Sequence, residues 1–336
     1  FGSQSEATVA DGDAPSRLIW GTTSDGAGAA SEKMRLTSDG KLGIGTTSPS
    51  YPLHVDGTIN GVGISSNITN FSESILISND AGTGTLSSAS NNTGLGYEVF
   101  DDITSAVGNT AVGRKALTAL TTGSNNTAMG LNAMLVNTTG SNNVAIGRLA
   151  LDANTTGSYN TALGTAALGA NTTADENTAV GYVAGSAITT GTYNTLIGSE
   201  AGDAITTGSQ NVAMGKSALG ALTTGDANVA IGYRAMLTAG TGVGNNIAVG
   251  RDTLYNTTGD NNVAVGRDAM NDNTSGAENV AIGSYALDAN TTADDNVAVG
   301  YQALTDNTTG GSNTAIGKTS LANNTTANDN TAVGYQ

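Results

Sequence analysis

A seventeen-residue unit repeats along most of this 336-residue chain, and it constrains the fold more than any other feature. The stretch NTAMGLNAMLVNTTGSN, at residues 126–142, is followed directly by NVAIGRLALDANTTGSY. A fixed period of this length is typical of stacked arrays, in which each unit contacts only its neighbours. The repeat therefore predicts an elongated array and argues against a globular domain built around one pocket.

Each unit opens with an asparagine and carries a glycine four positions later. The spacing of the asparagines is constant, apart from one step that is longer by one, to Asn246, and a compensating shorter step after it. NTGLG extends the series back to Asn92, and SILIS at Ser74 is a degenerate copy. The repeat asparagines are Asn109, Asn126, Asn143, Asn160, Asn177, Asn194, Asn211, Asn228, Asn246, Asn262, Asn279, Asn296, Asn313 and Asn330. The repeat glycines are Gly113, Gly130, Gly147, Gly164, Gly181, Gly198, Gly215, Gly232, Gly250, Gly266, Gly283, Gly300, Gly317 and Gly334.

The other positions of the unit predict its secondary structure. An apolar, often β-branched residue stands three after the asparagine, an Ala-Leu pair stands seven and eight after it, and a turn such as NTTG follows. These residues favour β-strands, and no window shows a sustained helical period. We therefore predict an all-β fold, a parallel β-solenoid whose 17-residue coils each hold two short strands and two turns. About 15 coils at roughly 4.8 Å each give a segment of about 70 Å. The glycine is expected at a tight corner or at positive φ, and the asparagines are expected to form a side-chain ladder along the stack.

Small coils of this kind predict an oligomer. Two strands of four or five residues enclose only a single line of Val, Ile and Leu, so one coil leaves its apolar side open to water. Alanine stands two after almost every repeat asparagine, as at Ala128 and Ala145. We expect this small, flat ladder to let neighbouring chains approach closely around a common axis, as an intertwined or side-by-side homotrimer.

Composition excludes several classes of function. The net charge of −16 disfavours binding to nucleic acid or to an anionic membrane surface, because both depend on basic patches. The chain has no cysteine, which removes disulfides, thiolate chemistry and the usual zinc sites. No run of about 18 apolar residues occurs, so we expect no membrane insertion. Aromatic residues make up only 4%, too few for a thick core but compatible with a thin, hydrogen-bonded β array.

The first part of the chain differs from the array. Asp39-Gly40, between KMRL and KLGIG, predicts a β-hairpin, and Pro49 and Pro52 precede a short strand, LHV. The predicted organisation is a flexible or extended segment at 1–14, a small β-hairpin or collar module at 15–66, a transition with a degenerate coil at 67–91, and the solenoid at 92–336. The chain begins at Phe1 and ends within a repeat, so we expect it to be part of a longer protein.

Two segments resemble known families. NTAVG, AL and NTTGSNNTAMG resemble the head repeats of trimeric autotransporter adhesins, and the resemblance covers residues 92–336 fully and 74–91 weakly. It implies a left-handed β-roll and a trimer, although the unit is longer here than is usual in those adhesins. EKMRLTSDGKLGIGTTSPSYPLHVDGTI, at 32–59, resembles a segment common in phage tail fibres and related trimeric appendages. In those proteins it often precedes such repeats and, further on, a cleaved C-terminal chaperone.

Charged and aromatic residues concentrate in the two positions after the repeat glycine. All eight basic residues of the array lie there. Tyrosine and arginine are enriched at recognition sites, so this column is a candidate receptor-binding stripe. It is also a candidate seam between subunits, and a column that runs along the whole array favours the seam. The stripe comprises Arg114, Arg148, Tyr182, Lys216, Tyr233, Arg251, Arg267, Tyr301 and Lys318.

Other kinds of site have weaker support. Acidic corners such as TADDN at 292–296 offer oxygen ligands for calcium, but the glycine-aspartate repeat of calcium-binding β-rolls is absent, and we expect no cofactor. His54 is the only histidine and is expected to be structural. The Thr-Thr pairs suggest ice binding, which needs a flat face of threonines. Adjacent residues point in different directions, so these pairs do not form such a face. Asn-Thr-Thr triplets match glycosylation acceptors and arise from the repeat itself.

Catalysis is not expected, because a nucleophile and base pair needs a cysteine or a second histidine, and only carboxylate pairs remain. The sequence therefore predicts a non-enzymatic fibre, the shaft or head of an extracellular trimeric attachment appendage. A phage tail fibre is the first candidate, and a bacterial surface adhesin or secreted filament protein is the alternative. Its expected partners are copies of itself, other fibre or virion proteins, and a host-surface receptor or glycan.

Overall fold

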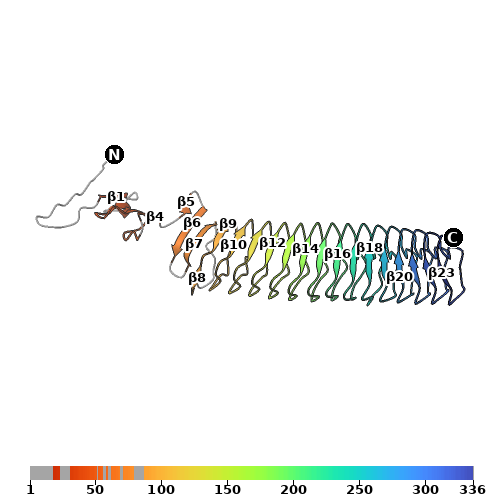
Figure 1. Cartoon of the computed structure of the whole chain (residues 1–336). Helices are drawn as coiled ribbons and strands as arrows, with labels where there is room; N and C mark the ends of the chain where they lie inside the picture. Colours follow the sequence, from red (N-terminus) through yellow and green to blue (C-terminus); the bar gives the residue numbers. More distant parts are fainter. Residues whose placement is uncertain are drawn as a thin grey trace, which may run out of the picture. The chain divides into compact units, whose positions relative to one another are not determined.

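The computed structural model describes residues 18–22, 31–50, 52–55, 58–59, 62–68, 71–78 and 87–335. These residues form 23 β-strands and no helix (Figure 1). The chain divides into two compact units, Phe1–Ile64 and Ser65–Gln336. The segment expected at 1–14 lies outside the described residues, and so do 79–86 of the expected transition.

The first unit contains a four-stranded sheet in the order β1-β2-β3-β4. The strands are β1 (Leu18–Thr22), β2 (Ser31–Leu36), β3 (Leu42–Ile44) and β4 (Leu53–Val55). β2 and β3 pair antiparallel, and Gly40 takes φ +81° in the turn between them. Thr37 closes that turn by donating its backbone N–H to the Lys41 carbonyl at 2.9 Å. The predicted Asp-Gly hairpin and the LHV strand are both confirmed.

Four further strands precede the regular array: β5 (Thr58–Ile59), β6 (Val62–Ile68), β7 (Phe71–Ser78) and β8 (Ala89–Ser90). β5 and β6 pair antiparallel, whereas β7 pairs parallel with β8 and with the first strand of the array. Ile75 lies opposite Thr93, which places Ser74 in register with Asn92. The degenerate copy predicted at SILIS therefore occupies the register of a coil.

The array is a parallel β-solenoid with one short strand in each coil. The strands are β9 (Thr93–Leu95), β10 (Thr110–Val112), β11 (Thr127–Met129), β12 (Val144–Ile146), β13 (Thr161–Leu163), β14 (Thr178–Val180), β15 (Thr195–Ile197), β16 (Val212–Met214), β17 (Val229–Ile231), β18 (Ile247–Val249), β19 (Val263–Val265), β20 (Val280–Ile282), β21 (Val297–Val299), β22 (Thr314–Ile316) and β23 (Thr331–Val333). Each strand pairs with the next at the same position of the repeat, as Ala111 does with Ala128. Figure 1 shows the strands side by side along one face. The predicted β-solenoid of 17-residue coils is confirmed.

The irregular steps of the repeat do not disturb this register. Val229 pairs with Ile247 across the longer step, and Ile247 pairs with Val263 across the shorter one. The longer coil takes its extra residue at the corner 238–244, where Gly242 has φ +79° and open space around it. A corner absorbs the change because it is not part of the strand ladder.

The prediction of two strands per coil is wrong, because the Ala-Leu segment does not extend. Lys115 and Leu117 adopt left-handed φ angles of 60° and 52°, and the equivalent residues of other coils do the same. Positive φ at every second residue folds the segment into turns. The segment still bonds from coil to coil, as Leu117 donates its N–H to the Ala133 carbonyl at 3.1 Å.

The interior of each coil is narrow and filled by small and medium side chains. Ala111, Ala116 and Leu117 are fully buried within the single chain, and so are most of their equivalents. The alanine ladder was expected to face neighbouring chains, and that expectation is wrong. Residues of a strand alternate between its two faces, and here only the middle one points inward.

Two kinds of repeated residue hold the coils in register. The Oδ1 atom of Asn109 accepts hydrogen bonds from the N–H and the Nδ2 of Asn126, at 2.9 and 3.1 Å, and the buried ladder continues along the stack. Gly113 has φ +127°, and a Cβ there would lie 2.6 Å from the Gly130 carbonyl oxygen of the next coil. The predicted asparagine ladder and glycine corner are both confirmed.

Candidate functional site

The outer face of the parallel sheet is largely apolar, and the chain itself does not cover it. The first and third residues of each strand point outward, and they are mostly Thr, Val, Ile, Leu or Met. Leu163, Ile231 and Ile282 are 43%, 37% and 41% exposed. The apolar residue three after the asparagine was expected to fill the middle of the coil, and this is wrong. It forms a ladder on the outside instead, and we call the first and third residues of β9–β23 the outer sheet face.

The predicted stripe lies along one edge of this face, directly after the glycine corner. All nine of its predicted residues are exposed. They are Arg114, Arg148, Tyr182, Lys216, Tyr233, Arg251, Arg267, Tyr301 and Lys318. Because the coils are in register, residues that are one repeat apart in sequence lie on neighbouring rungs, and the column predicted from sequence is a continuous edge.

Within the chain, the stripe is a stack of cations on aromatic rings. The guanidinium of Arg114 lies 5.5 Å from the Tyr97 ring centre, and that of Arg267 lies 4.6 Å from Tyr285. Lys318 lies between the Tyr301 and Tyr335 rings, at 5.9 and 5.5 Å. These contacts orient the cations along the edge while leaving them exposed.

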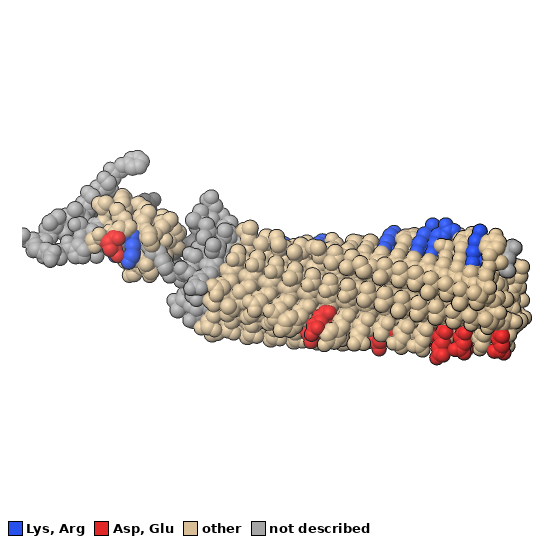
Figure 2. Space-filling model, viewed as in Figure 1, with Lys and Arg blue, Asp and Glu red and all other residues tan. Residues whose placement is uncertain are grey.

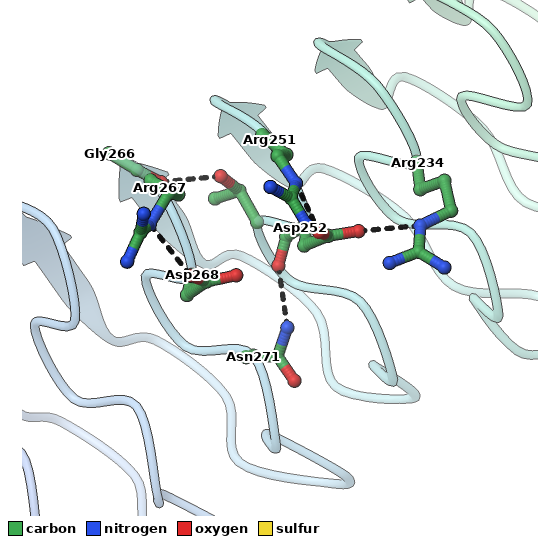
Figure 3. A network of polar contacts seen from close by, with 8 residues as sticks. Arg234, Arg251, Asp252, Gly266, Arg267, Asp268 and Asn271 are labelled. Atoms are coloured by element: carbon green, nitrogen blue, oxygen red, sulfur yellow. Dashed lines mark hydrogen bonds and ion pairs between the residues drawn. The ribbon is translucent and has the colours of Figure 1, made fainter.

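The most connected part of the stripe surrounds Asp252 (Figure 3). Its two carboxylate oxygens accept hydrogen bonds from Nε of Arg234 at 2.7 Å and Nε of Arg251 at 2.8 Å. Burial raises the pKa of the Asp252 carboxyl, but the hydrogen bonds from the two arginines outweigh it, so this pKa lies below its usual value. Asn271 donates to the Asp252 carbonyl at 2.9 Å, and Arg267 pairs with Asp268 at 3.0 Å. The network joins three successive coils.

The opposite edge of the outer sheet face is acidic. Eight carboxylates occupy the two positions before the repeat asparagine, and all are exposed. They are Asp175, Glu176, Asp226, Asp260, Glu278, Asp294, Asp295 and Asp329. We call them the acidic edge, and the eight Lys and Arg residues of the stripe's two positions the basic edge. Figure 2 shows blue along one long side of the solenoid, red along the other, and neither colour on the broad face between.

Some of these acidic corners have a structural task that the sequence did not reveal. Asp175 Oδ1 accepts the backbone N–H of Ser158 at 2.7 Å, and Asp294 Oδ1 accepts that of Ala277 at 2.8 Å. Each such carboxylate satisfies a backbone donor of the preceding coil. Among the described residues, no group of three or more His, Cys, Asp or Glu side chains is arranged to hold a metal ion.

The NTTG turns contain a second asparagine ladder that was not predicted from the sequence. Asn154 is fully buried, and its Nδ2 donates to Asn137 Oδ1 at 3.0 Å and to the Gly157 carbonyl at 2.9 Å. The threonine that follows bonds onward, with Thr138 Oγ1 donating to the Thr155 carbonyl at 3.0 Å. The asparagine amides of these triplets are therefore structural rather than exposed acceptors for glycans. The regular spacing of the triplets was the sequence signal that could have predicted this second ladder.

His54 lies in β4, where it is half-buried and accepts the Ser50 N–H at 3.4 Å through Nδ1. This placement agrees with a structural histidine. In the described part of the chain, no helix is both long and apolar enough to cross a bilayer. Comparison with protein-family models, curated proteins and solved structures finds no match for this chain.

Proposed function

We propose that this chain is a non-enzymatic structural component of an extracellular attachment appendage, with a phage tail fibre as the first candidate. Parallel, in-register chains form a homotrimer, and the trimer is the shaft or head of the appendage. Its task is mechanical, because stacked coils hold a binding tip at a fixed distance from the particle or cell. Other fibre or virion proteins and a host-surface receptor or glycan are the remaining partners.

One observation carries this proposal: the outer sheet face presents an apolar third residue in all 15 strands from β9 to β23, beside a first residue that is Val or Ile in seven strands and Thr in eight. An exposed apolar surface of this extent is typical of an interaction site. Fourteen spacings of about 4.8 Å and a strand width of about 10 Å give roughly 650 Å² per chain, close to the roughly 800 Å² that each partner buries in a stable interface. A partner must match both the length and the period of the face, and a copy of the chain does.

One observation favours the alternative, a bacterial surface adhesin or secreted filament protein. Three tyrosines in nearby coils are strongly exposed, Tyr159 at 62%, Tyr182 at 58% and Tyr193 at 55%. Exposed tyrosines suit contacts made by the side of the rod, whereas a shaft that only carries a tip does not need them.

Two measurements test the proposal. Sedimentation velocity of the whole chain is expected to give a trimer, and electron microscopy is expected to show slender rods. A folded monomer at micromolar concentration contradicts the assembly and, with it, the fibre. Immunogold labelling with antibodies against the array then separates the two candidates, since label on virion tails indicates a tail fibre and label on the cell surface indicates an adhesin.

A further inference from the structure

The two edges of the outer sheet face differ in charge: the two positions after the repeat glycine hold eight bases and four carboxylates, Glu98, Glu200, Asp252 and Asp268, whereas the charged residues in the two positions before the repeat asparagine are all carboxylates. The eight positions that hold a base in the array all lie after the glycine corner, and none lies before the asparagine. The acidic edge holds eight carboxylates and no base, and β9–β23 hold no charged residue at all. The edges are about six residues apart along each coil, which is about 20 Å of extended chain. The face is therefore a largely apolar band with one border of net positive charge, +4 from eight bases and four carboxylates, and one negative border.

We propose that sister chains close over this band in parallel, with the basic edge of one chain against the acidic edge of the next. The inference rests on the proposed homotrimer and adds to it the contact that sets orientation. It assigns the stripe to a seam between subunits and identifies the other side of that seam.

Symmetry supports the parallel arrangement. Rotation about an axis along the rod keeps every chain pointing the same way and brings unlike edges together at each junction, so the ring closes with complementary contacts. Turning one chain end over end keeps each edge on its own side, so base would face base and acid would face acid. Like charges at close range cost several kcal/mol, and the segregated borders therefore reject the antiparallel pairing.

The positions of the charges along the rod also disfavour a large axial shift between chains. From the coil of Asn228 to that of Asn330, the basic edge carries four cations and the acidic edge carries six carboxylates. The cations are Arg234, Arg251, Arg267 and Lys318, and the carboxylates are Asp226, Asp260, Glu278, Asp294, Asp295 and Asp329. A shift of one chain by many coils would move the cations away from these carboxylates. The apolar band alone cannot set the register, because it is nearly the same in every coil.

The cations are available for such a contact. Arg251 and Arg267 side chains are 60% and 50% exposed, although each pairs through Nε with an aspartate of its own chain. A guanidinium has five N–H donors in a planar fork, so one bond through Nε leaves four for a second carboxylate. On the opposite edge, Glu278 and Asp295 lie next to the repeat asparagine and are exposed.

Charge exchange tests the seam on the full-length chain. We expect Arg251→Glu with Arg267→Glu to weaken assembly about 100-fold at about 50 mM salt, since both edges become acidic. Glu278→Lys with Asp295→Lys is expected to weaken assembly too, because it places two cations on the acidic edge and reduces the net charge of that edge in this segment from −6 to −2. The chain with all four changes has opposite charges exchanged at these four positions and is expected to recover assembly relative to either pair alone. Sedimentation velocity measures assembly, and far-UV circular dichroism confirms that each variant keeps its coils.

A matched control separates the seam from a general effect of charge. Asp272→Lys with Asp306→Lys makes the same change in net charge as the acidic-edge pair on exposed residues away from both edges, and we expect assembly to stay within twofold of wild type. Assembly that survives both edge reversals overturns the seam while leaving the fibre standing. If the edge variants are folded but the four-site exchange does not restore their assembly, the seam proposal is also overturned. A monomeric wild-type chain that binds an anionic polymer overturns both proposals and favours the receptor stripe.

Discussion

The inside and the outside of the repeated strand differ in how they are covered. On the inside, the chain satisfies itself, because Asn109 and its equivalents bond from coil to coil and alanines pack against leucines with no exposed surface. On the outside, the same short strand presents apolar side chains to solvent. The fold therefore uses the inward residue of each strand, and the proposed assembly uses the outward ones. A substitution can therefore damage one of them without the other.

The largest expected effect comes from placing one charge on each side of the same strand. Ala230 is fully buried and Ile231 is 37% exposed. We expect Ala230→Asp to cost more than about 4 kcal/mol of folding free energy, because it buries an unpaired carboxylate. Ile231→Asp is expected to change the stability of a single chain by less than about 0.5 kcal/mol and to weaken assembly. Chemical denaturation of dilute protein and sedimentation measure the two effects, and equal loss of stability in both variants contradicts the comparison.

The glycine corner gives the next effect. Gly113→Ala adds a Cβ that would lie 2.6 Å from the Gly130 carbonyl oxygen at φ +127°. We expect a loss of about 4 kcal/mol from backbone strain and overpacking together. Gly334→Ala is the matched control, since φ there is +141° and no atom lies within 4 Å of the added Cβ. This control should lose only the stability that corresponds to backbone strain. Equal losses of stability for the two variants in thermal melts would rule out contact between coils as the cause.

The third effect concerns a coil whose interior is repacked. Leu196 replaces the inward alanine, and glycines at 185 and 202 replace the leucines that would otherwise meet it. A Cβ on Gly202 would lie 2.8 Å from a methyl carbon of Leu196, so the side chain already fills this space. We expect Leu196→Ala to cost about 3 kcal/mol, because the glycines cannot fill the cavity. The pair Leu196→Ala with Gly202→Leu should recover part of that loss in urea denaturation, and a double variant weaker than either single one would argue against volume compensation.

The smallest effect is a dependence on pH. Burial, together with the charges of Asp272 and Asp268, raises the pKa of the Asp288 carboxyl to about 6. The folded chain then holds this proton more tightly than the unfolded chain does, so the carboxylate destabilises the fold above about pH 6 and the penalty disappears as pH falls toward 4. Asp288→Asn should raise the free energy of unfolding at neutral pH by less than about 1 kcal/mol, since this group is only half-buried, and change nothing near pH 4. Urea denaturation at the two pH values measures this, with Asp306→Asn as the control. An increase that persists near pH 4 would contradict burial of the charge as its cause.

The sequence was sufficient for three features that each repeat in a single column. Strand positions, the asparagine ladder and the glycine corner follow from residues that recur at one spacing, since only one stacking register aligns them all. The stripe was found for the same reason. Its partners within the chain were not found, because Asp252 contacts both Arg234 of the preceding coil and its own neighbour Arg251, and this depends on how each coil is staggered over the next.

The assignment of inside and outside could not be made from residue types alone. In seven of the 15 strands from β9 to β23, such as Val144–Ile146, all three residues are apolar, so alternation has no polar member to mark the solvent side. The other eight strands begin with a threonine, which was the available signal. Space decides instead, because Leu151 of the same coil occupies the interior and leaves room there only for an alanine. The number of strands per coil was also overestimated, since positive φ at residues such as Leu151 and Tyr285 has no clear signal in their types.

The corner at 238–244 has a consequence for how such a molecule can diversify. The coil with this corner is one residue longer than the usual repeat and the next coil is one residue shorter, while Val229, Ile247 and Val263 stay aligned. Loop length at that corner is thus uncoupled from the hydrogen-bonded ladder. A longer peptide grafted at this point would be presented at a known height on a rigid support, which makes the corner a natural location for variable binding sequences and an insertion site for engineered display.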